Sequence, residues 1–163
     1  MTRKIHKILV VNPGTRYMGM AVFHGPELMD WRVKVISGKW SKEKPQKILA
    51  LVRTFMEQYK PDILAIKKLH RSRSSANLNR LARRIKQDCT RNGLRVCQCT
   101  IRELEAFLLG EGRNSKGKLA QVLATEYPFL LPEFQKEREN KKPYYFRMFE
   151  AVALGAACSR RLH

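Results

Sequence analysis

A basic run between residues 67 and 95 holds the densest group of side chains that could bind a ligand. Ten Lys and Arg residues lie in it against a single acid, Asp88. The loop RSRSS, residues 71–75, adds hydroxyl groups, and Ser74 or Ser75 can cap a following helix. Guanidinium groups, hydroxyls and helix N-termini all bind phosphate oxygens. The run therefore predicts contact with a phosphate-rich partner, with a solvated helix face as the alternative; the candidate residues are Lys68, Arg71, Arg73, Ser74, Arg80, Arg83 and Arg84.

A second candidate phosphate contact lies in the segment GEGRNSKGK, residues 110–118. Its glycines permit a tight turn that brings backbone N–H groups close to an anion, and a helix is predicted to follow the turn. We expect Arg113 and Lys116 to contact phosphate there, although Gly-Arg turns also form for purely local reasons.

The stretch VVNPGTRYMGMAVF, residues 10–23, combines an apolar strand, a Pro-Gly turn and a second strand. Asn12 stands at the bend, where such a turn would most usefully hold a carboxylate. An amide keeps the shape of a carboxylate and one weak oxygen ligand, but it carries no negative charge. Because hard divalent cations prefer charged oxygen ligands, Asn12 offers them little.

Apolar patterns define the elements that must hold these groups. Extended runs over 7–12, 18–24 and 28–36, with Gly25-Pro26 between the last two, predict three successive strands. Further strands are expected over 63–66 and 94–97, and helices over 48–59, from Ser74 to Asn92-Gly93, and over 101–109, 116–127 and 145–160, with 128–143 irregular. This order implies one α/β domain over residues 1–163, with a mixed five-stranded sheet flanked by helices.

The charge of the chain indicates the class of partner. Lys and Arg outnumber Asp and Glu by 33 to 14, which gives a net charge of +19, while 44% of the residues are hydrophobic. That apolar share is too high for a disordered basic tail. A folded, strongly cationic chain repels itself and is drawn to a polyanion, so nucleic acid is the first partner expected and acidic lipid is the main competitor.

The remaining sequence features concern location and thiols. The segment MTRKIHKILVV has too short an apolar run for a signal peptide or a membrane span, so we expect a cytoplasmic protein with no membrane partner. The spacing of Cys89, Cys97, Cys99 and Cys158 does not form two C-x-x-C pairs. Reduced, mostly buried thiols are therefore expected rather than a zinc site.

Four segments, in order, resemble the RuvC family of Holliday-junction resolvases, which have an RNase H-like fold. VVNPGTRYMGMAVF resembles the first-strand motif D-P-G-T-R, followed by a further Gly. DILAIKKLH, residues 62–70, resembles the fourth strand, and GEGRNSKGKLAQVL, residues 110–123, resembles a G-x-G-R-x-x-K segment that opens a helix. FRMFEAVALGAA, residues 146–157, resembles the final helix, where two acidic residues three apart face the active site. The resemblance covers most of the chain and implies the same α/β fold.

The resemblance implies a place for a nuclease site but not its usual residues. Such folds usually hydrolyse phosphodiesters with two Mg²⁺ ions held by converging carboxylates. The matching positions are Asn12, Lys67, Arg147 and Glu150, so one carboxylate remains. Two unit charges about 4 Å apart interact by roughly 4 kcal/mol at an effective dielectric near 20, so Lys67 should repel a metal ion strongly. We therefore expect no metal and no other cofactor.

Two uses of this vestigial site follow. Lys67 and Arg147 can supply the positive charge that a metal would bring and hold a phosphate, with Glu150 as their counter-ion. Alternatively, Asn12, Lys67 and Glu150 pair with one another and only stabilise the sheet. A one-residue error in the alignment at Lys67, or a natural Asp replaced by Asn12, would change this interpretation.

The resemblance also implies roles for neighbouring residues. In the family, the segment after the fourth strand carries an aromatic wedge, and the matching residue is His70, which we expect to stack on a base. Arg16, beside the vestigial site, either contacts DNA or forms a salt bridge at the edge of the core. The aromatic residues expected to pack the last helix or the core are Tyr144, Tyr145, Phe146, Phe149 and Phe107.

The function expected from this resemblance is binding of Holliday junctions or other branched or duplex DNA, as a homodimer and without metal-dependent cleavage. The setting implied is DNA recombination and repair. One alternative is an active, Mg²⁺-dependent junction-resolving endonuclease that uses Glu150 together with Glu103, Glu105 or Asp62. Another is a protein that binds structured RNA, whose A-form grooves differ in shape.

Overall fold

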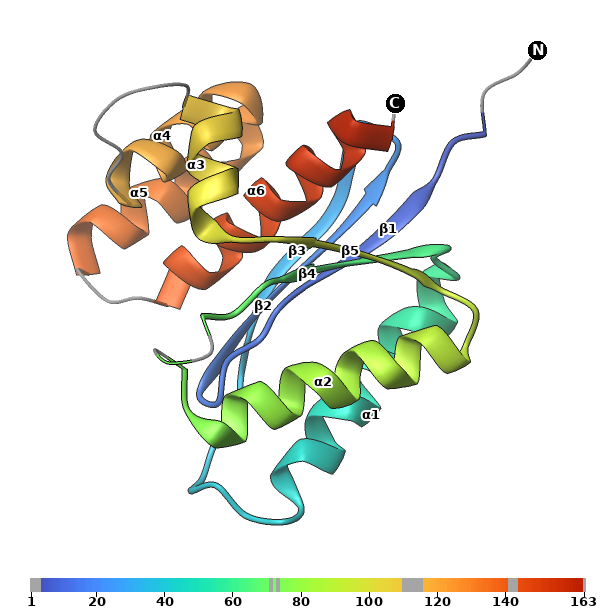
Figure 1. Cartoon of the computed structure of the whole chain (residues 1–163). Helices are drawn as coiled ribbons and strands as arrows, with labels where there is room; N and C mark the ends of the chain where they lie inside the picture. Colours follow the sequence, from blue (N-terminus) through green and yellow to red (C-terminus); the bar gives the residue numbers. More distant parts are fainter. Residues whose placement is uncertain (1–3, 71, 73, 110–115, 141–143, 163) are drawn as a thin grey trace.

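The computed structural model describes residues 4–70, 72, 74–109, 116–140 and 144–162, and its centre is one five-stranded sheet (Figure 1). The strand order is β3-β2-β1-β4-β5. β1 runs antiparallel to β2, and β2 antiparallel to β3, while β1, β4 and β5 are parallel. The strands are β1 (Lys7–Asn12), β2 (Tyr17–His24), β3 (Glu27–Val35), β4 (Ile63–Lys67) and β5 (Arg95–Cys99).

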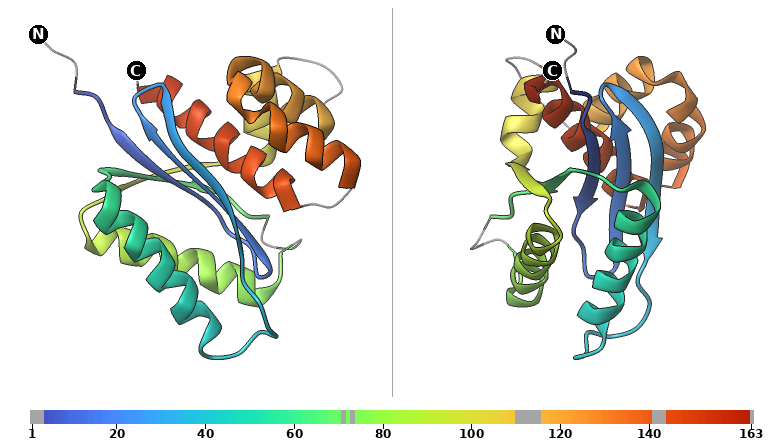
Figure 2. Two further views of the ribbon diagram at one scale, coloured as in Figure 1. Left: turned by 180° about the vertical axis from the view of Figure 1, so that it is seen from behind. Right: turned by 90° about the vertical axis from the view of Figure 1, so that its right-hand side faces the viewer.

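Helices cover both faces of the sheet (Figures 1 and 2). α1 (Lys44–Tyr59) and α2 (Ala76–Arg91) lie against one face. α6 (Tyr144–Leu162) crosses the other face, with α3 (Ile101–Leu109), α4 (Lys116–Glu126) and α5 (Leu131–Asn140) packed around it. No helix in the described part of the chain is both long enough and apolar enough to cross a membrane.

Alternation of side chains along β1 explains why the sheet is covered twice. Ile8 and Val10 point to the face covered by α6, and Leu9 and Val11 point to the face covered by α1 and α2. All four side chains are fully buried. A central strand with two apolar faces needs helices on both sides, which is the reason for the three-layer arrangement.

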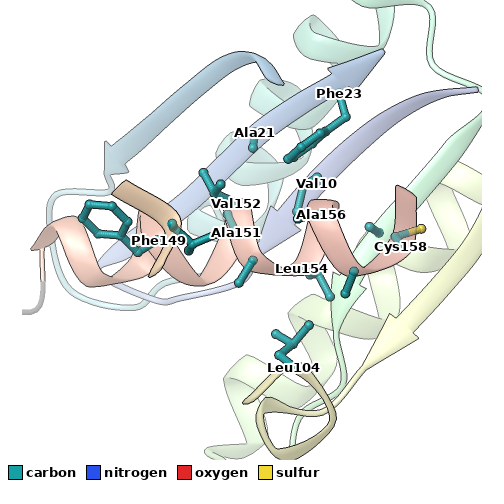
Figure 3. Packing of buried hydrophobic residues seen from close by; sticks show 14 of the residues in the cluster. Val10, Ala21, Phe23, Leu104, Phe149, Ala151, Val152, Leu154, Ala156 and Cys158 are labelled. Atoms are coloured by element: carbon teal, nitrogen blue, oxygen red, sulfur yellow. The ribbon is translucent and has the colours of Figure 1, made fainter. Parts of the chain in front are cut away.

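Small residues let α6 approach the sheet closely, as the close-up of the core shows (Figure 3). A Cβ atom built on Gly155 would lie 2.2 Å from the ring of Phe23, and one on Gly19 would lie 2.0 Å from the carbonyl oxygen of Arg147. Ala151 and Ala156 continue the small-residue face of the helix. Glycine at these two contacts therefore sets how near α6 lies to β1 and β2.

The sheet and its flanking helices confirm the expected architecture, with one error between residues 128 and 143. That stretch was expected to be irregular, but it contains a 3₁₀ turn, η1 (Pro128–Leu130), and α5. Pro132 lies in the first turn of α5, where its missing N–H has no helical partner to lose. The helix is mostly polar, and it is anchored through Phe134, which packs edge-on against Phe149.

The expected aromatic packing is confirmed for Phe146 and Phe149, which are buried, and for Tyr145, which lies partly buried against the same core. The side chain of Tyr144 lies outside the described residues. Phe107 was expected in the core, and this expectation was wrong: its side chain is 43% exposed and lies under the guanidinium of Arg160. Leu104 takes the inward face of α3 instead.

The cysteines match the expectation of free, mostly buried thiols. Cys89, Cys99 and Cys158 are buried, and Cys97 is partly exposed. Burial raises the pKa of the Cys89 thiol to about 12.

Candidate nucleic-acid interface

The parallel pairing of β1 and β4 brings together two of the positions expected to match the nuclease site. Val11 pairs with Ile66, so Asn12 and Lys67, each one residue further along, lie side by side at the carboxyl ends of their strands. The first half of α6 crosses this edge and supplies Glu150. Ligands of open α/β sheets bind outside the carboxyl ends of the strands, so this edge is the place to look for a site.

The side chains at this edge pair with one another. The Asn12 amide nitrogen donates to the carbonyl oxygen of Arg147 at 3.0 Å and to Glu150 Oε1 at 3.5 Å. Lys67 Nζ donates to Glu150 Oε2 at 2.7 Å. Asn12 is fully buried, and the Glu150 side chain is 4% exposed against 19% for Lys67. The pairing considered as an alternative from sequence, Asn12 with Glu150 and Glu150 with Lys67, is therefore present.

Arg147 takes a different place from the one expected. Its guanidinium donates to the carbonyl oxygen of Pro13 at 3.4 Å, and it forms no ion pair with Glu150 in the described structure. Among the described residues, the counter-ion of Glu150 is Lys67. Arg147 instead ties the turn after β1 to α6.

These donors do not fit a pair of divalent cations. Glu150 is the one carboxylate, and an ammonium group already neutralises it. Asn12 Oδ1 is buried without a hydrogen-bond partner and is the one oxygen left over near it. Among the described residues, no three His, Cys, Asp or Glu side chains are grouped so that they could hold a metal ion. Two doubly charged ions need several anionic ligands to offset their repulsion, and this site supplies none beyond the paired Glu150.

The other carboxylates weighed from the sequence lie away from Glu150 or are occupied. Asp62 precedes β4, at the opposite end of that strand, and accepts a hydrogen bond from His6 at 2.7 Å. Glu103 pairs with Arg161 at 3.2 Å. Glu105 lies on α3 and forms no recorded pair with the described residues.

A basic pocket opens beside the ion pair, where β4 and β5 end. Its volume is 430 Å³, and its polar lining includes Lys67, Lys68, His70, Ser74, Thr100 and Arg102. A smaller pocket of 170 Å³ shares Lys67 and Lys68 and adds Arg83 and Lys86 from α2. Both pockets are lined by cations and neutral side chains without an acid, which suits a phosphate oxygen.

Local hydrogen bonds fix the start of α2 at this pocket. Ser75 is the cap: its hydroxyl accepts from the Leu78 N–H at 3.1 Å. The Ser74 N–H donates to the carbonyl oxygen of His70 at 3.0 Å, and the Ser72 hydroxyl lies 2.9 Å from the ring nitrogen of His70. Of the two serines considered, Ser75 therefore caps the helix and Ser74 lines the pocket.

The arginines expected to bind phosphate are exposed where the structure describes them. Arg83 and Arg84 form no hydrogen bond or ion pair with the described residues, while Arg80 bonds Asn77 Oδ1 at 3.3 Å. Arg16 is exposed above the ring of Tyr17 and forms no salt bridge with the described residues, which was its alternative role. Arg71, Arg73 and Arg113 lie outside the described residues, and Lys116 opens α4 with its side chain undescribed.

Sequence reasoning missed two residues of this edge. Thr100 and Arg102 line the larger pocket because the turn after β5 returns beside β4. The available signal was that Thr100 lies shortly after a predicted strand and Arg102 at the start of a predicted helix. The order of the strands, which places both residues beside Lys67, is a long-range property that a local pattern does not give.

Three solved structures, two of RuvC and one of a poxvirus resolvase, are similar to this chain over nearly its whole length. The chain is similar to Thermus thermophilus RuvC, with a TM-score of 0.67 and 18% identity over 96% of this chain and 93% of that one. A second structure, T. thermophilus RuvC in complex with Holliday junction substrate, gives a TM-score of 0.66 and 16% identity over the same shares. The crystal structure of Fowlpox virus resolvase and substrate Holliday junction DNA complex gives 0.59 and 15%, over 96% of this chain and 98% of that one.

These likenesses show that the chain has a RuvC-type, RNase H-like fold, which confirms the fold expected from the sequence. No family model matches the sequence, and a search of curated proteins gives no match either.

Proposed function

We propose that the protein binds Holliday junctions or other branched or duplex DNA at the carboxyl edge of its sheet and does not cleave them by a metal-dependent reaction. The observation that carries the proposal is the buried Glu150 carboxylate, which Lys67 neutralises at 2.7 Å. The net charge of +19 and the resolvase structures in complex with junction DNA support the choice of partner.

Different side chains contact different parts of the DNA. Lys67 and Lys68 hold a backbone phosphate at the pocket, with Ser74 and Thr100 as hydroxyl donors. His70, exposed at the rim, stacks on a base at the branch. Arg83 and Arg84 extend the positive surface along α2. The shared ion pair of Lys67 with Glu150 keeps the edge rigid while the exposed cations meet the DNA.

The assembly belongs to the same proposal. A four-way junction has two equivalent halves, so a homodimer that presents two such edges suits it, and we place this homodimer in the cytoplasm. DNA rather than structured RNA is the proposed ligand because the neighbours bound to nucleic acid hold junction DNA.

The test is one incubation with two readouts. An end-labelled four-way junction is mixed with the protein, with and without Mg²⁺ or Mn²⁺, and run on a native and a denaturing gel. We expect a shifted complex and an uncut strand in every lane. Paired, symmetric, metal-dependent cuts would overturn the inactive assignment, and stronger competition by duplex RNA than by the junction would transfer the binding to RNA.

A further inference from the structure

A separate pocket lies between the loop that follows β3 and the first half of α2. Its volume is 530 Å³, within the roughly 300–1,000 Å³ of small-ligand sites. Its lining combines apolar and aromatic side chains, from Trp40, Pro45 and Leu81, with cationic ones, from Lys42, Arg80 and Arg84. None of its lining residues is acidic.

The walls of this pocket are held in place. The ammonium of Lys44, a residue only 6% exposed, donates to the carbonyl oxygen of Gly38 at 2.7 Å and ties down the loop. The N–H of Ile36 donates to the carbonyl oxygen of Arg16 at 2.8 Å at the start of the same loop. Trp40 packs against the core cluster of Leu81, which is 1% exposed. The indole is therefore presented on a fixed support.

The chemistry of the lining fits a base with its phosphates. An indole ring stacks on a planar base, and the gain does not depend on which base it is. Lys42 and Arg84 form no hydrogen bond or ion pair with the described residues, so their charges are available to an anion. Arg80 is oriented by Asn77 and by the carbonyl oxygen of Ala76.

We propose that this pocket binds one unpaired base of a DNA strand, with Trp40 stacked on the base and Lys42, Arg80 and Arg84 on the adjoining phosphates. The proposal rests on the DNA-binding function proposed above and extends it to unpaired strands. The pocket volume of 530 Å³ has room for a base turned out of its stack, whereas the bases of an intact duplex are enclosed. The two arginines lie on the helix that carries Arg83, so a strand leaving the junction edge along α2 reaches Trp40.

The chain offers a direct readout because it has two tryptophans, Trp31 and Trp40. The Trp31→Phe variant leaves Trp40 as the single indole, and Trp40→Phe leaves Trp31, which packs against Phe129 in a different layer. Each protein is titrated with an oligothymidylate, with an abasic strand of equal length and charge, and with thymidine monophosphate, while tryptophan emission is recorded. A junction gel shift is run on each preparation, and circular dichroism confirms folding.

We expect oligothymidylate to quench the emission of the Trp31→Phe variant and to leave that of Trp40→Phe nearly unchanged. The abasic strand should bind without this quenching, and the mononucleotide should bind more weakly than the strand. A Trp40→Ala variant should lose roughly tenfold in affinity for oligothymidylate, the size of one lost base stack, with its duplex affinity unchanged.

Contrary results separate the two proposals. Unchanged Trp40 emission at saturating oligothymidylate, in a protein that still shifts the junction, overturns the base pocket and leaves DNA binding intact. Equal quenching by the abasic strand, or equal affinity for the mononucleotide, overturns the assignment to a base within a strand. A protein that shifts neither the junction nor the single strand overturns both proposals.

Discussion

The ion pair between Lys67 and Glu150 makes each charge depend on the other. Glu150 is 4% exposed, so removal of its partner leaves a buried carboxylate uncompensated. We expect Lys67→Met to lower the free energy of unfolding by about 3 kcal/mol. Urea denaturation measures the loss, and the matched control is Lys68→Met, at an exposed position, which should change stability by less than about 0.5 kcal/mol.

A double variant tests whether the loss of stability comes from the unpaired charge of Glu150. Lys67→Met combined with Glu150→Leu should recover most of the loss, because an apolar pair replaces the ion pair without an unpaired charge. A double variant less stable than Lys67→Met alone would show that Glu150 has a partner stronger than Lys67.

The residues at positions 12 and 67 also predict how a metal site could be built. Asn12→Asp combined with Lys67→Glu adds two carboxylates beside Glu150. We expect this variant to be less stable than the wild type without metal and to gain stability with Mn²⁺, whereas wild type gains none. Free metal at about 100 times the dissociation constant of the site stabilises the folded protein by about 2.7 kcal/mol. Thermal denaturation with and without Mn²⁺ measures this, and equal shifts in both proteins would contradict it.

The thiols provide a residue-scale prediction about pH. Hydrogen bonds from Cys158 and Cys99, with the charge of Arg161, hold the pKa of the Cys97 thiol well below its usual range, and Cys97 is partly exposed. A lowered pKa keeps the thiolate present as the pH falls, so alkylation of Cys97 by iodoacetamide should slow little between pH 8 and pH 6. An ordinary thiol, with a pKa of about 8.5, slows nearly tenfold per unit there.

Peptide mass spectrometry after timed alkylation distinguishes the four cysteines. Cys89 is the internal control: it is buried, with a raised pKa, and should be labelled far more slowly than Cys97. Labelling of Cys97 that falls tenfold per pH unit would mean that its sulfur is protonated at neutral pH.

At the scale of elements, the contact of α6 with β2 positions Glu150. The chain at Arg147 lies against Gly19, where an added Cβ would meet a carbonyl oxygen at 2.0 Å. We expect Gly19→Ala to push α6 outward and to lower the free energy of unfolding by about 3 kcal/mol. The backbone fixes the position of the Cβ, and the carbonyl oxygen belongs to the backbone, so neither atom can rotate away. Chemical denaturation measures the loss. Gly38→Asn is the comparison: nothing lies within 4 Å of its Cβ position, so its cost is the strain of a side chain at a positive φ of 90° and not a clash.

A result that separates packing from general glycine effects comes from comparing the two variants. If Gly19→Ala leaves the stability unchanged, close approach of α6 is not the reason for glycine at position 19. If neither variant lowers the free energy of unfolding, α6 can move away from β2 far enough to make room for a Cβ at position 19.

The sequence predicted what depends on local rules and failed where distant segments decide. The cap of α2, its end at Asn92-Gly93 and the buried β1 run follow from capping and periodicity. Helix α5 was not predicted because its mostly polar sequence has no apolar periodicity. Phe107 was wrongly expected in the core because phenylalanine is usually buried, whereas here it lies on the outward face of its helix. The pairing of Lys67 with Glu150 joins residues 83 apart, so no local pattern could indicate it, and it was considered only because of the family resemblance.

The candidate site was predictable to a similar extent. The four candidate positions were proposed from the resemblance, and the structure brings Asn12, Lys67 and Glu150 together. The counter-ion role of Arg147 was wrong because its side chain reaches Pro13 instead. Trp40 was missed because a lone aromatic residue in a loop carries no period, and its pocket exists only when α2 packs beside the loop.

At the scale of the whole molecule, position rather than total charge should decide binding. The net charge of +19 is spread over the chain, but the pockets gather cations where β4 and β5 end. A general attraction to polyanions would make every surface cation equivalent. If the DNA binds at one edge of the sheet, the few cations at that edge contribute far more to the affinity than the others, because each phosphate contact releases a counterion.

Two double variants of equal charge separate these cases. Lys68→Glu with Arg83→Glu reverses cations at the binding edge, and Lys60→Glu with Arg95→Glu reverses exposed cations at the amino ends of β4 and β5. Each reversal changes the charge by two, so both variants fall from +19 to +15. Junction affinity is measured over a series of salt concentrations. We expect the edge variant to lose about two phosphate contacts, which lowers the slope of log affinity against log salt by about 1.8, while the other keeps nearly the wild-type slope. Equal losses in both variants would mean that the junction is held by the overall charge and not by the carboxyl edge of the sheet.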